Sequence, residues 1–442
     1  MATKAGAVFN RSAIYWICVL ALFTAALSNS VRVGVSGAMK AALLDPLDPG
    51  RSGEMLGTVL GSSFLGFALS LLVISPLLDK IGARKIVLFA ATCFVIGPVL
   101  VLLAGNAGSS VYLLLNVAMV IWGFGWGATE ASINPVTATL YPDDKTGRLN
   151  SLHAWWPAGL IVGGLLSVFL FNQSGVAWEV LIALPIVPGV LCGLWALRHP
   201  FPQTESTARG VSFGNMIKEP FKRPTFWVFF LLMFLTASAE LAPGAWVDVT
   251  LSNTAGMPGV LVLVYVSAIM FVMRHFAGAL DRKFSDMGLL WMCTVPAGIG
   301  LYLLSTANSP FTALVAATLW AFGVCFMWPT MMAAVSRRYP DSGPWGIGLI
   351  GFAGALAIYF VLPQLGAIYD KAKLERAGGE TAFNAMAAGT PEMQDVLGYA
   401  SEVSFQTIAI IPAILFVIFG AVWYLERRRG ALGSPSTAVP AE

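Results

Sequence analysis

The chain has 442 residues, of which 57% are hydrophobic and only 11% are charged, and its formal net charge is +3. This composition excludes a water-soluble multidomain protein, because too few polar side chains are available to cover its surface. It is typical of an all-α protein that crosses a membrane many times, since helices satisfy their own backbone groups within lipid. The five cysteines form no CxxC pair and no histidine cluster lies beside them, so neither a disulfide framework nor a metal site is predicted.

Twelve apolar runs of about 20 residues follow one another, each long enough to cross a bilayer. A polar connector at 199–223 separates the sixth run from the seventh. The sequence therefore predicts a half at 1–198, a second half at 224–429 and a disordered tail at 430–442. The runs cover approximately 13–39, 55–78, 86–105, 111–140, 149–171, 179–198, 224–251, 258–280, 288–306, 310–334, 344–368 and 403–425.

Basic residues are distributed unevenly between these runs. With the N-terminus in the cytoplasm, most lysines and arginines fall on the cytoplasmic side, so the positive-inside tendency predicts that both termini are cytoplasmic. For the outer insertion at 370–402 we expect a short helix or flap over the outer mouth. The outer side keeps only Lys40, Arg51, Lys371, Lys373 and Arg376.

The two predicted halves repeat short pieces of sequence. Phe124-Gly125 and Tyr141-Pro142-Asp143 recur as Phe322-Gly323 and Tyr339-Pro340-Asp341, at one offset of 198 residues. Repeated halves around a central connector are typical of transporters whose halves rock about a site near the bilayer midplane.

A basic residue, Arg32, interrupts the first run and shares one helical face with Asn29 and Ser36. Its guanidinium could pair with a buried carboxylate or bind an anionic substrate through two hydrogen bonds. Alternatively, Arg32 lies close enough to the outer surface to extend its charged end into water.

The loop after the second run reads Ser75-Pro-Leu-Leu-Asp79-Lys80-Ile-Gly82-Ala-Arg84-Lys85. It resembles the loop signature of the major facilitator superfamily, GxxxD(R/K)xGx(R/K)(R/K), and departs from it only where Ser75 replaces a glycine. Serine is still small enough for a close approach of helices. The resemblance covers essentially the whole chain and implies twelve transmembrane helices in two pseudo-symmetric six-helix halves.

The fourth run contains a carboxylate, Glu130, about ten residues before the turn at Tyr141, which places it near the bilayer centre. It shares a helical face with Gly123, Gly127 and Asn134, and the glycines would let a helix or a substrate approach. An intramembrane carboxylate is most often functional, and the alternative is a structural ion pair with a basic residue.

Within the superfamily, the fucose permease branch of sugar:cation symporters is similar to this chain at Glu130-Ala-Ser-Ile-Asn134-Pro135 and at Arg148-Leu-Asn150-Ser-Leu-His153-Ala-Trp155. The resemblance implies that Glu130 is a substrate-site carboxylate involved in proton coupling and that His153 and Trp156 line the cavity. A core or helix-cap role is the alternative for His153. Fucose permeases place an aspartate in the first helix, where this chain reads Ser28 to Val33. The resemblance makes Arg32 the candidate partner of Glu130, since the first and fourth helices line the cavity in this superfamily.

The seventh run contains Glu240 near its middle and Asp248 about two turns further out. Pro243 and Gly244 lie between them and predict a broken or kinked helix, a common feature of gates. We expect Glu240 to be a second candidate for cation coupling and Asp248 to be solvated at the outer mouth.

Charged residues near the cytoplasmic ends of the helices predict a gate. Arg274 ends the eighth run, and Asp281 in the following loop echoes Asp79 of the loop signature. We expect Asp79, Arg84, Arg274 and Asp281 to pair across the halves while the site faces outward and to separate when it opens inward.

Four of the 14 tryptophans lie deep in their runs, where an indole can stack on the apolar face of a sugar. Helix packing is the alternative for each of them. One of the four corresponds to Glu130 through the 198-residue offset. These residues are Trp126, Trp156, Trp246 and Trp328.

Together these features predict a secondary active transporter that moves a small polar solute, a monosaccharide, by alternating access coupled to protons or sodium. An efflux transporter for drugs or other amphipathic compounds is one alternative, and a non-transporting ligand sensor is another. The sequence offers no nucleophile and base, phosphate loop or metal cluster, so neither an enzyme nor a cofactor is expected. We expect a monomer in the bacterial inner membrane, without a nucleic-acid partner.

Overall fold

The computed structural model describes residues 9–48, 52–254, 259–387 and 390–428, and the elements within these ranges are helices. The N-terminal half is built from α1 (Arg11–Gly34), α2 (Ser36–Met39), α3 (Ser52–Ile81), α4 (Ala83–Ala104), α5 (Val111–Leu140), α6 (Lys145–His153), α7 (Trp155–Leu166), α8 (Trp178–Ala183) and α9 (Ile186–Leu197). Two short helices, α10 (Glu205–Ala208) and α11 (Phe213–Lys222), lie in the connector.

The C-terminal half comprises α12 (Pro224–Thr254), α13 (Gly259–Arg274), α14 (Ala277–Ser305), α15 (Pro310–Val324), α16 (Met327–Arg338), α17 (Gly343–Ala377), α18 (Glu380–Ala385) and α19 (Pro391–Arg428). Short 3-10 turns at Pro142–Asp144 and Pro340–Ser342 precede α6 and α17. Eleven helical segments of the described chain are long and apolar enough to cross a membrane, and the eighth predicted run is described as a shorter apolar helix, Leu261–Arg274. The predicted break at Pro243 is absent, because α12 continues through this residue.

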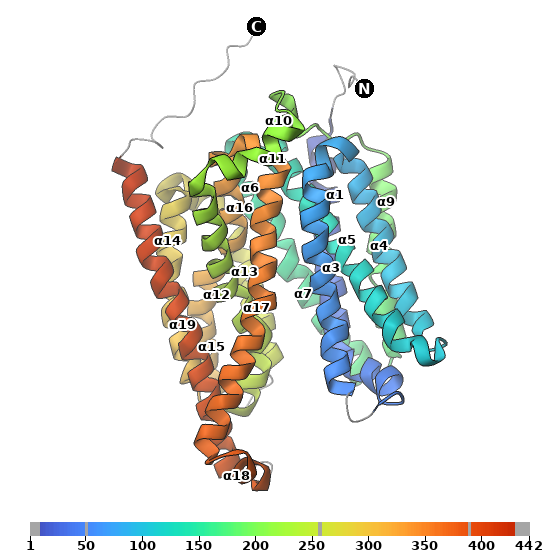
Figure 1. Ribbon diagram of the computed structural model, residues 1–442, viewed down its shortest axis with the longest axis vertical. Helices are drawn as coiled ribbons and strands as arrows, with labels where there is room; N and C mark the ends of the chain where they lie inside the picture. Colours follow the sequence, from blue (N-terminus) through green and yellow to red (C-terminus); the bar gives the residue numbers. More distant parts are fainter. Residues whose placement is uncertain (1–8, 49–51, 255–258, 388–389, 429–442) are drawn as a thin grey trace.

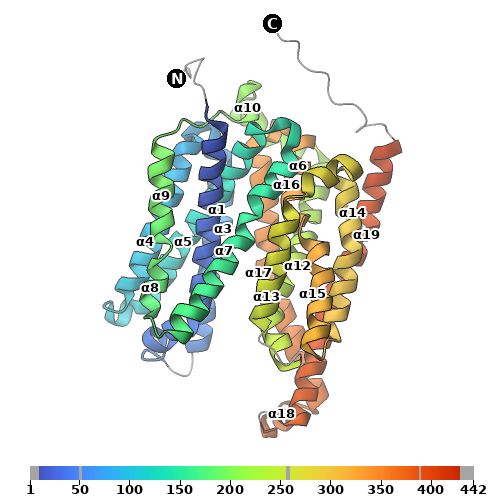
Figure 2. The same cartoon turned by 180° about the vertical axis from the view of Figure 1, so that it is seen from behind.

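The helices form two bundles that lie side by side in both views (Figures 1 and 2). Helix α1 begins and α19 ends at the same end of the molecule, which we call the terminal side, and α10 and α11 lie across it. We call the opposite end the distal side. Most buried apolar side chains form two large clusters, one drawn almost wholly from each half. Separate cores are expected of two bodies that move relative to each other.

Glycines bring neighbouring helices together in the same way in the two halves. A Cβ added to Gly123 of α5 would lie 2.0 Å from the carbonyl oxygen of Ser63 in α3, and one added to Gly300 of α14 would lie 2.2 Å from the backbone nitrogen of Trp320 in α15. Any side chain at these positions would collide with backbone atoms. The predicted glycine face of the fourth run therefore contacts a neighbouring helix.

The outer insertion continues α17 and α19 beyond the other helices on the distal side, with α18 at its tip (Figure 1). At 1.5 Å per residue these helices are each longer than about 50 Å, whereas the hydrocarbon core is about 30 Å thick. Tyr369, Ala372 and Ala400 form a small cluster between them, and Arg376 pairs with Asp395 at 2.8 Å. The short helix expected here is present. The predicted tail at 430–442 lies outside the described residues.

Candidate functional site

Glu130 forms a buried polar chain with two residues that the sequence placed beside it. Its Oε2 accepts a hydrogen bond of 2.7 Å from Nδ2 of Asn134, one turn further along α5. The Oδ1 of Asn134 lies 2.8 Å from Nε2 of His153, at the end of α6. An amide oxygen only accepts, so Nε2 of His153 carries the hydrogen in this chain. The Glu130 and His153 side chains themselves approach to 3.8 Å.

The structure does not place Arg32 beside Glu130. The guanidinium donates to the carbonyl oxygen of Ser28 at 3.2 Å and to Oδ1 of Asn29 at 3.1 Å, and it contacts the sulfur of Met119 at 3.5 Å. Because Arg32 is only 4% exposed, the alternative in which it extends into water is wrong. The Glu130 carboxylate therefore accepts its hydrogen bond from a neutral group, Asn134, with His153 as its nearest basic group among the described residues.

An aromatic stack stands one turn from Glu130. The Trp126 ring of α5 is stacked between Phe67 of α3, at a centroid distance of 3.9 Å, and Trp156 of α7, at 4.8 Å. The two tryptophans are half-buried. The structure thus brings together Trp126 and Trp156, which the sequence named separately, and adds Phe67, which carried no sequence signal beyond its aromatic type.

In the C-terminal half, Glu240 and Arg274 form a buried ion pair of 2.7 Å, which the sequence did not predict. The guanidinium also donates to the carbonyl oxygen of Cys325 at 2.6 Å and, across the halves, to that of His153 at 2.7 Å. The second oxygen of Glu240 accepts from the backbone nitrogen of Trp328 at 3.3 Å. Arg274, predicted to belong to the gate, therefore pairs with a carboxylate of its own half and bonds a backbone carbonyl of the other half, and its role in a gate stays a prediction.

Of three further predicted residues, Trp328, Trp246 and Asp248, only Trp328 has a described side chain. Trp328 is buried against α17, where a Cβ on Gly354 would lie 2.2 Å from its ring, so its packing matches the alternative of a core residue. The side chains of Trp246 and Asp248 lie outside the described residues.

The terminal side is closed by polar contacts, although not by the predicted pairs across the halves. Asp281 pairs with Arg337 of its own half at 2.9 Å, and Arg337 reaches the other half through Thr146 Oγ1 at 2.7 Å. A second bond between the halves joins Asn150 to Thr330 at 3.0 Å. A glycine pair allows this approach, since a Cβ on Gly278 would lie 3.0 Å from the Cα of Gly147.

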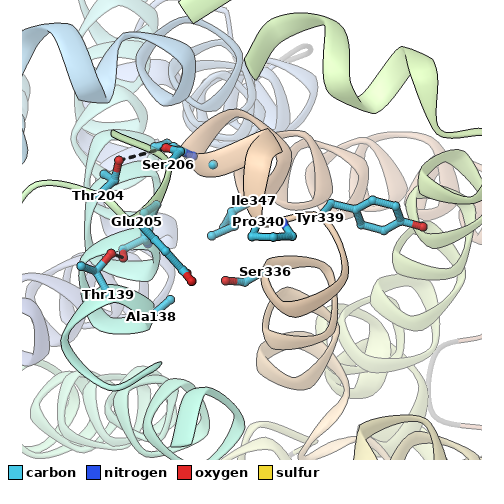
Figure 3. Close-up of a pocket in the computed structure, with 12 residues that line it drawn as sticks. Ala138, Thr139, Thr204, Glu205, Ser206, Ser336, Tyr339, Pro340 and Ile347 are labelled. Carbon is cyan, nitrogen blue, oxygen red and sulfur yellow. Dashed lines mark hydrogen bonds between the residues drawn. The ribbon is translucent and has the colours of Figure 1, made fainter. Parts of the chain in front are cut away.

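The connector takes part in this closure. Asp79 accepts hydrogen bonds from Thr204 and Ser206, and Lys145 pairs with Glu205 at 2.6 Å. Arg84, predicted in the gate, donates instead to the carbonyl oxygen of Leu197. Figure 3 shows the small pocket between the connector and both halves, with Thr204, Glu205 and Ser206 opposite Ser336, Tyr339, Pro340 and Ile347. The sequence missed these connector contacts because they join segments that are far apart in the chain.

Comparison with known proteins places the chain among membrane transporters. A family model described as Major Facilitator Superfamily matches residues 12–362. A D-xylose transporter of Levilactobacillus brevis is 29% identical over 148 residues, which are 33% of this chain and 30% of that protein. The Multidrug resistance protein D of Escherichia coli is 24% identical over 313 residues, or 68% and 74% of the two chains.

Among solved structures, the fucose:proton symporter of E. coli matches with a TM-score of 0.66 at 16% identity, over 91% of this chain and 98% of that one. This likeness confirms the predicted fold of twelve membrane-spanning helices in two halves.

Proposed function

Because the chain belongs to the Major Facilitator Superfamily, a family of membrane transporters, we propose that it moves a monosaccharide across the membrane together with a proton. The membrane is proposed to be the bacterial inner membrane, with the terminal side in the cytoplasm. The chain would act as a monomer.

The observation that carries this proposal is the buried Glu130 with its neutral partners. A carboxylate inside the membrane is costly to ionise without a cation beside it, and a proton removes that cost. Asn134 bonds the carboxylate and His153 bonds Asn134, so the chain Glu130–Asn134–His153 joins α5 to α6. The sugar hydroxyls would bind these polar groups, and the apolar face of the ring would lie on Trp156.

The transport cycle follows from the closed terminal side. In this arrangement a proton and the solute reach Glu130 from the distal side, and the site becomes neutral. The halves then rock, which requires that the bonds of Thr146 to Arg337 and of Asn150 to Thr330 break. Release of solute and proton on the terminal side returns Glu130 to its ionised form.

The names of two similar proteins support a sugar as the solute and a proton as the coupled ion. The D-xylose transporter and the fucose:proton symporter are named for sugars, but the chain spans less than a third of the former's length, and likeness to the latter at 16% identity shows the fold alone. The Multidrug resistance protein D supports a second candidate, efflux of amphipathic compounds, which the half-buried aromatic stack also favours. Competition for binding by sugars and by lipophilic cations separates these two functions.

The decisive test is Glu130→Gln in proteoliposomes. With an acidic exterior, the unaltered protein should accumulate the sugar against its gradient, whereas the variant should lose accumulation and keep sugar exchange, because exchange needs no net proton movement. Glu380→Gln, on the exposed α18 of the insertion, is the matched control. Undiminished proton-driven accumulation by Glu130→Gln would overturn the proposal.

A further inference from the structure

We propose that Arg32 binds the carboxylate of the transported solute, so that the substrate is a sugar acid with one carboxylate rather than a neutral sugar. This inference rests on the proposed function and narrows its substrate class. It is carried by the incomplete set of partners around a buried guanidinium.

The two buried arginines of the described chain provide an internal comparison. Arg274, 2% exposed, donates to a carboxylate and to two carbonyl oxygens at 2.6 to 2.7 Å. Arg32, 4% exposed, has only two neutral oxygens at 3.1 to 3.2 Å and a thioether sulfur at 3.5 Å. None of the described carboxylates lies within ion-pair distance of Arg32. A guanidinium has five N–H donors in a fork that matches a carboxylate, so Arg32 retains donors for one.

The surroundings of Arg32 would present such a carboxylate to the proposed site. Its Nη2 edge meets Asn29, which is half-buried, so this edge lies at the border of the packed interior. Its charged group lies over the ring of Trp122, with 4.9 Å to the centroid. Trp122, Trp126 and Glu130 follow one another at four-residue spacing along α5, which corresponds to a rise of about 6 Å per step. A solute held at Arg32 would therefore extend its hydroxyl-bearing body past Trp126 toward Glu130.

The balance of charge among the four buried groups Glu130, Arg32, Glu240 and Arg274 also favours a solute with one carboxylate. Glu240 and Arg274 cancel each other through their ion pair. When Glu130 takes up a proton, the charge of Arg32 has no counterpart among these four buried groups. One carboxylate on the solute restores neutrality, and an uncompensated charge within the membrane is expensive. Proton and solute would then enter together as a neutral pair, and each cycle would move no net charge.

The test compares acids with neutral compounds of similar shape. Thermal unfolding of the purified protein is measured with D-glucuronate, D-galacturonate and D-gluconate, and with D-glucose, D-galactose and sorbitol. We expect at least one acid to stabilise the protein and its neutral counterpart not to. Arg32→Gln should weaken binding of that acid by about 30-fold or more, and Arg32→Lys by less, because lysine keeps the charge without the fork. Arg376→Gln, in the outer insertion, is the matched control and should bind normally.

A second measurement uses the unaltered protein and so does not depend on the folding of a variant. In proteoliposomes, a proton gradient should drive uptake of the stabilising acid, and an imposed potassium diffusion potential should leave the rate unchanged. Proton-driven uptake of neutral sugars, with no acid bound, would overturn this inference and leave the proposed function standing. Proton-independent uptake of every compound would overturn the proposed function itself. Acid binding that survives Arg32→Gln unaltered would also overturn the role of Arg32.

Discussion

The two halves each bury a glutamate and an arginine but arrange them differently. In the C-terminal half, Glu240 and Arg274 bond directly at 2.7 Å. In the N-terminal half, Glu130 and Arg32 are each held by neutral groups. A paired charge is already satisfied, whereas an unpaired one is open to an exchangeable partner such as a proton or a solute. The difference suggests that the buried charges of the N-terminal half serve proton coupling and solute binding, whereas those of the C-terminal half stabilise the structure.

One residue joins the two arrangements. The ring of His153 contacts Asn134 and, through it, Glu130, whereas its carbonyl oxygen accepts from Arg274 of the other half. A shift of His153 when Glu130 is protonated or solute binds would therefore move a hydrogen-bond acceptor of Arg274, and so would act on the C-terminal ion pair.

Breaking the C-terminal ion pair should cause the largest loss of stability. Arg274→Ala leaves Glu240 buried without its cation and should lower the free energy of unfolding by about 3–5 kcal/mol. Arg32→Ala removes a guanidinium that has no carboxylate, so it should cost less than about 2 kcal/mol. Denaturant unfolding in detergent measures both values. Equal losses in the two variants would remove the distinction between the halves.

The double variant Glu240→Gln/Arg274→Met is the control for the first prediction. It removes both charges together, so it should regain much of the stability lost in Arg274→Ala. If it is as unstable as the single variant, the loss comes from the carbonyl oxygens of Cys325 and His153 and not from the unpaired carboxylate.

The next prediction concerns packing, in which the halves should behave alike. Gly123→Ala and Gly300→Ala each place a methyl group against backbone atoms and should each destabilise the protein by about 1–3 kcal/mol. Gly57→Ala, where an added Cβ meets nothing within 4 Å, should instead be neutral or stabilising by about 0.5–1 kcal/mol. Thermal or denaturant unfolding compares the three. A large loss in only one half would show that the glycine packing is not equivalent.

The sequence predicted the fold well because apolar run length and a loop signature are local properties. Glu130, Asn134 and His153 were also named together, since helical spacing and the resemblance to fucose permeases both pointed to them. The partners of Arg274 and Arg337 were not predicted. Arg337 and Thr146 are 191 residues apart, and only the packed halves bring them within 2.7 Å. A sequence pattern shows which charged groups are buried, but not which of them meet.

A smaller effect on binding should distinguish the tryptophans of the two halves. Trp156→Ala removes one ring of the aromatic stack and should weaken solute binding by about 3- to 10-fold, with Trp156→Phe retaining most of the affinity. Trp328→Phe should leave affinity nearly unchanged, because that ring packs against Gly354. Calorimetric titration with the stabilising solute measures these affinities. A greater loss at Trp328 would move the binding surface into the C-terminal half.

The smallest effect concerns the closed terminal side. Thr146→Ala removes one hydrogen bond between the halves, from Arg337 Nη2, and leaves the pair of Arg337 with Asp281 intact. A net loss of about 1 kcal/mol corresponds to about a fivefold shift toward the state that is open on this side. Spin-label distances between the terminal ends of α6 and α14 measure the shift, and Thr312→Ala, in an exposed helix cap of α15, is the control. If the distribution of distances does not change, the remaining bonds hold this side closed without the bond to Thr146, among them those of Asn150 to Thr330 and of the connector to Asp79.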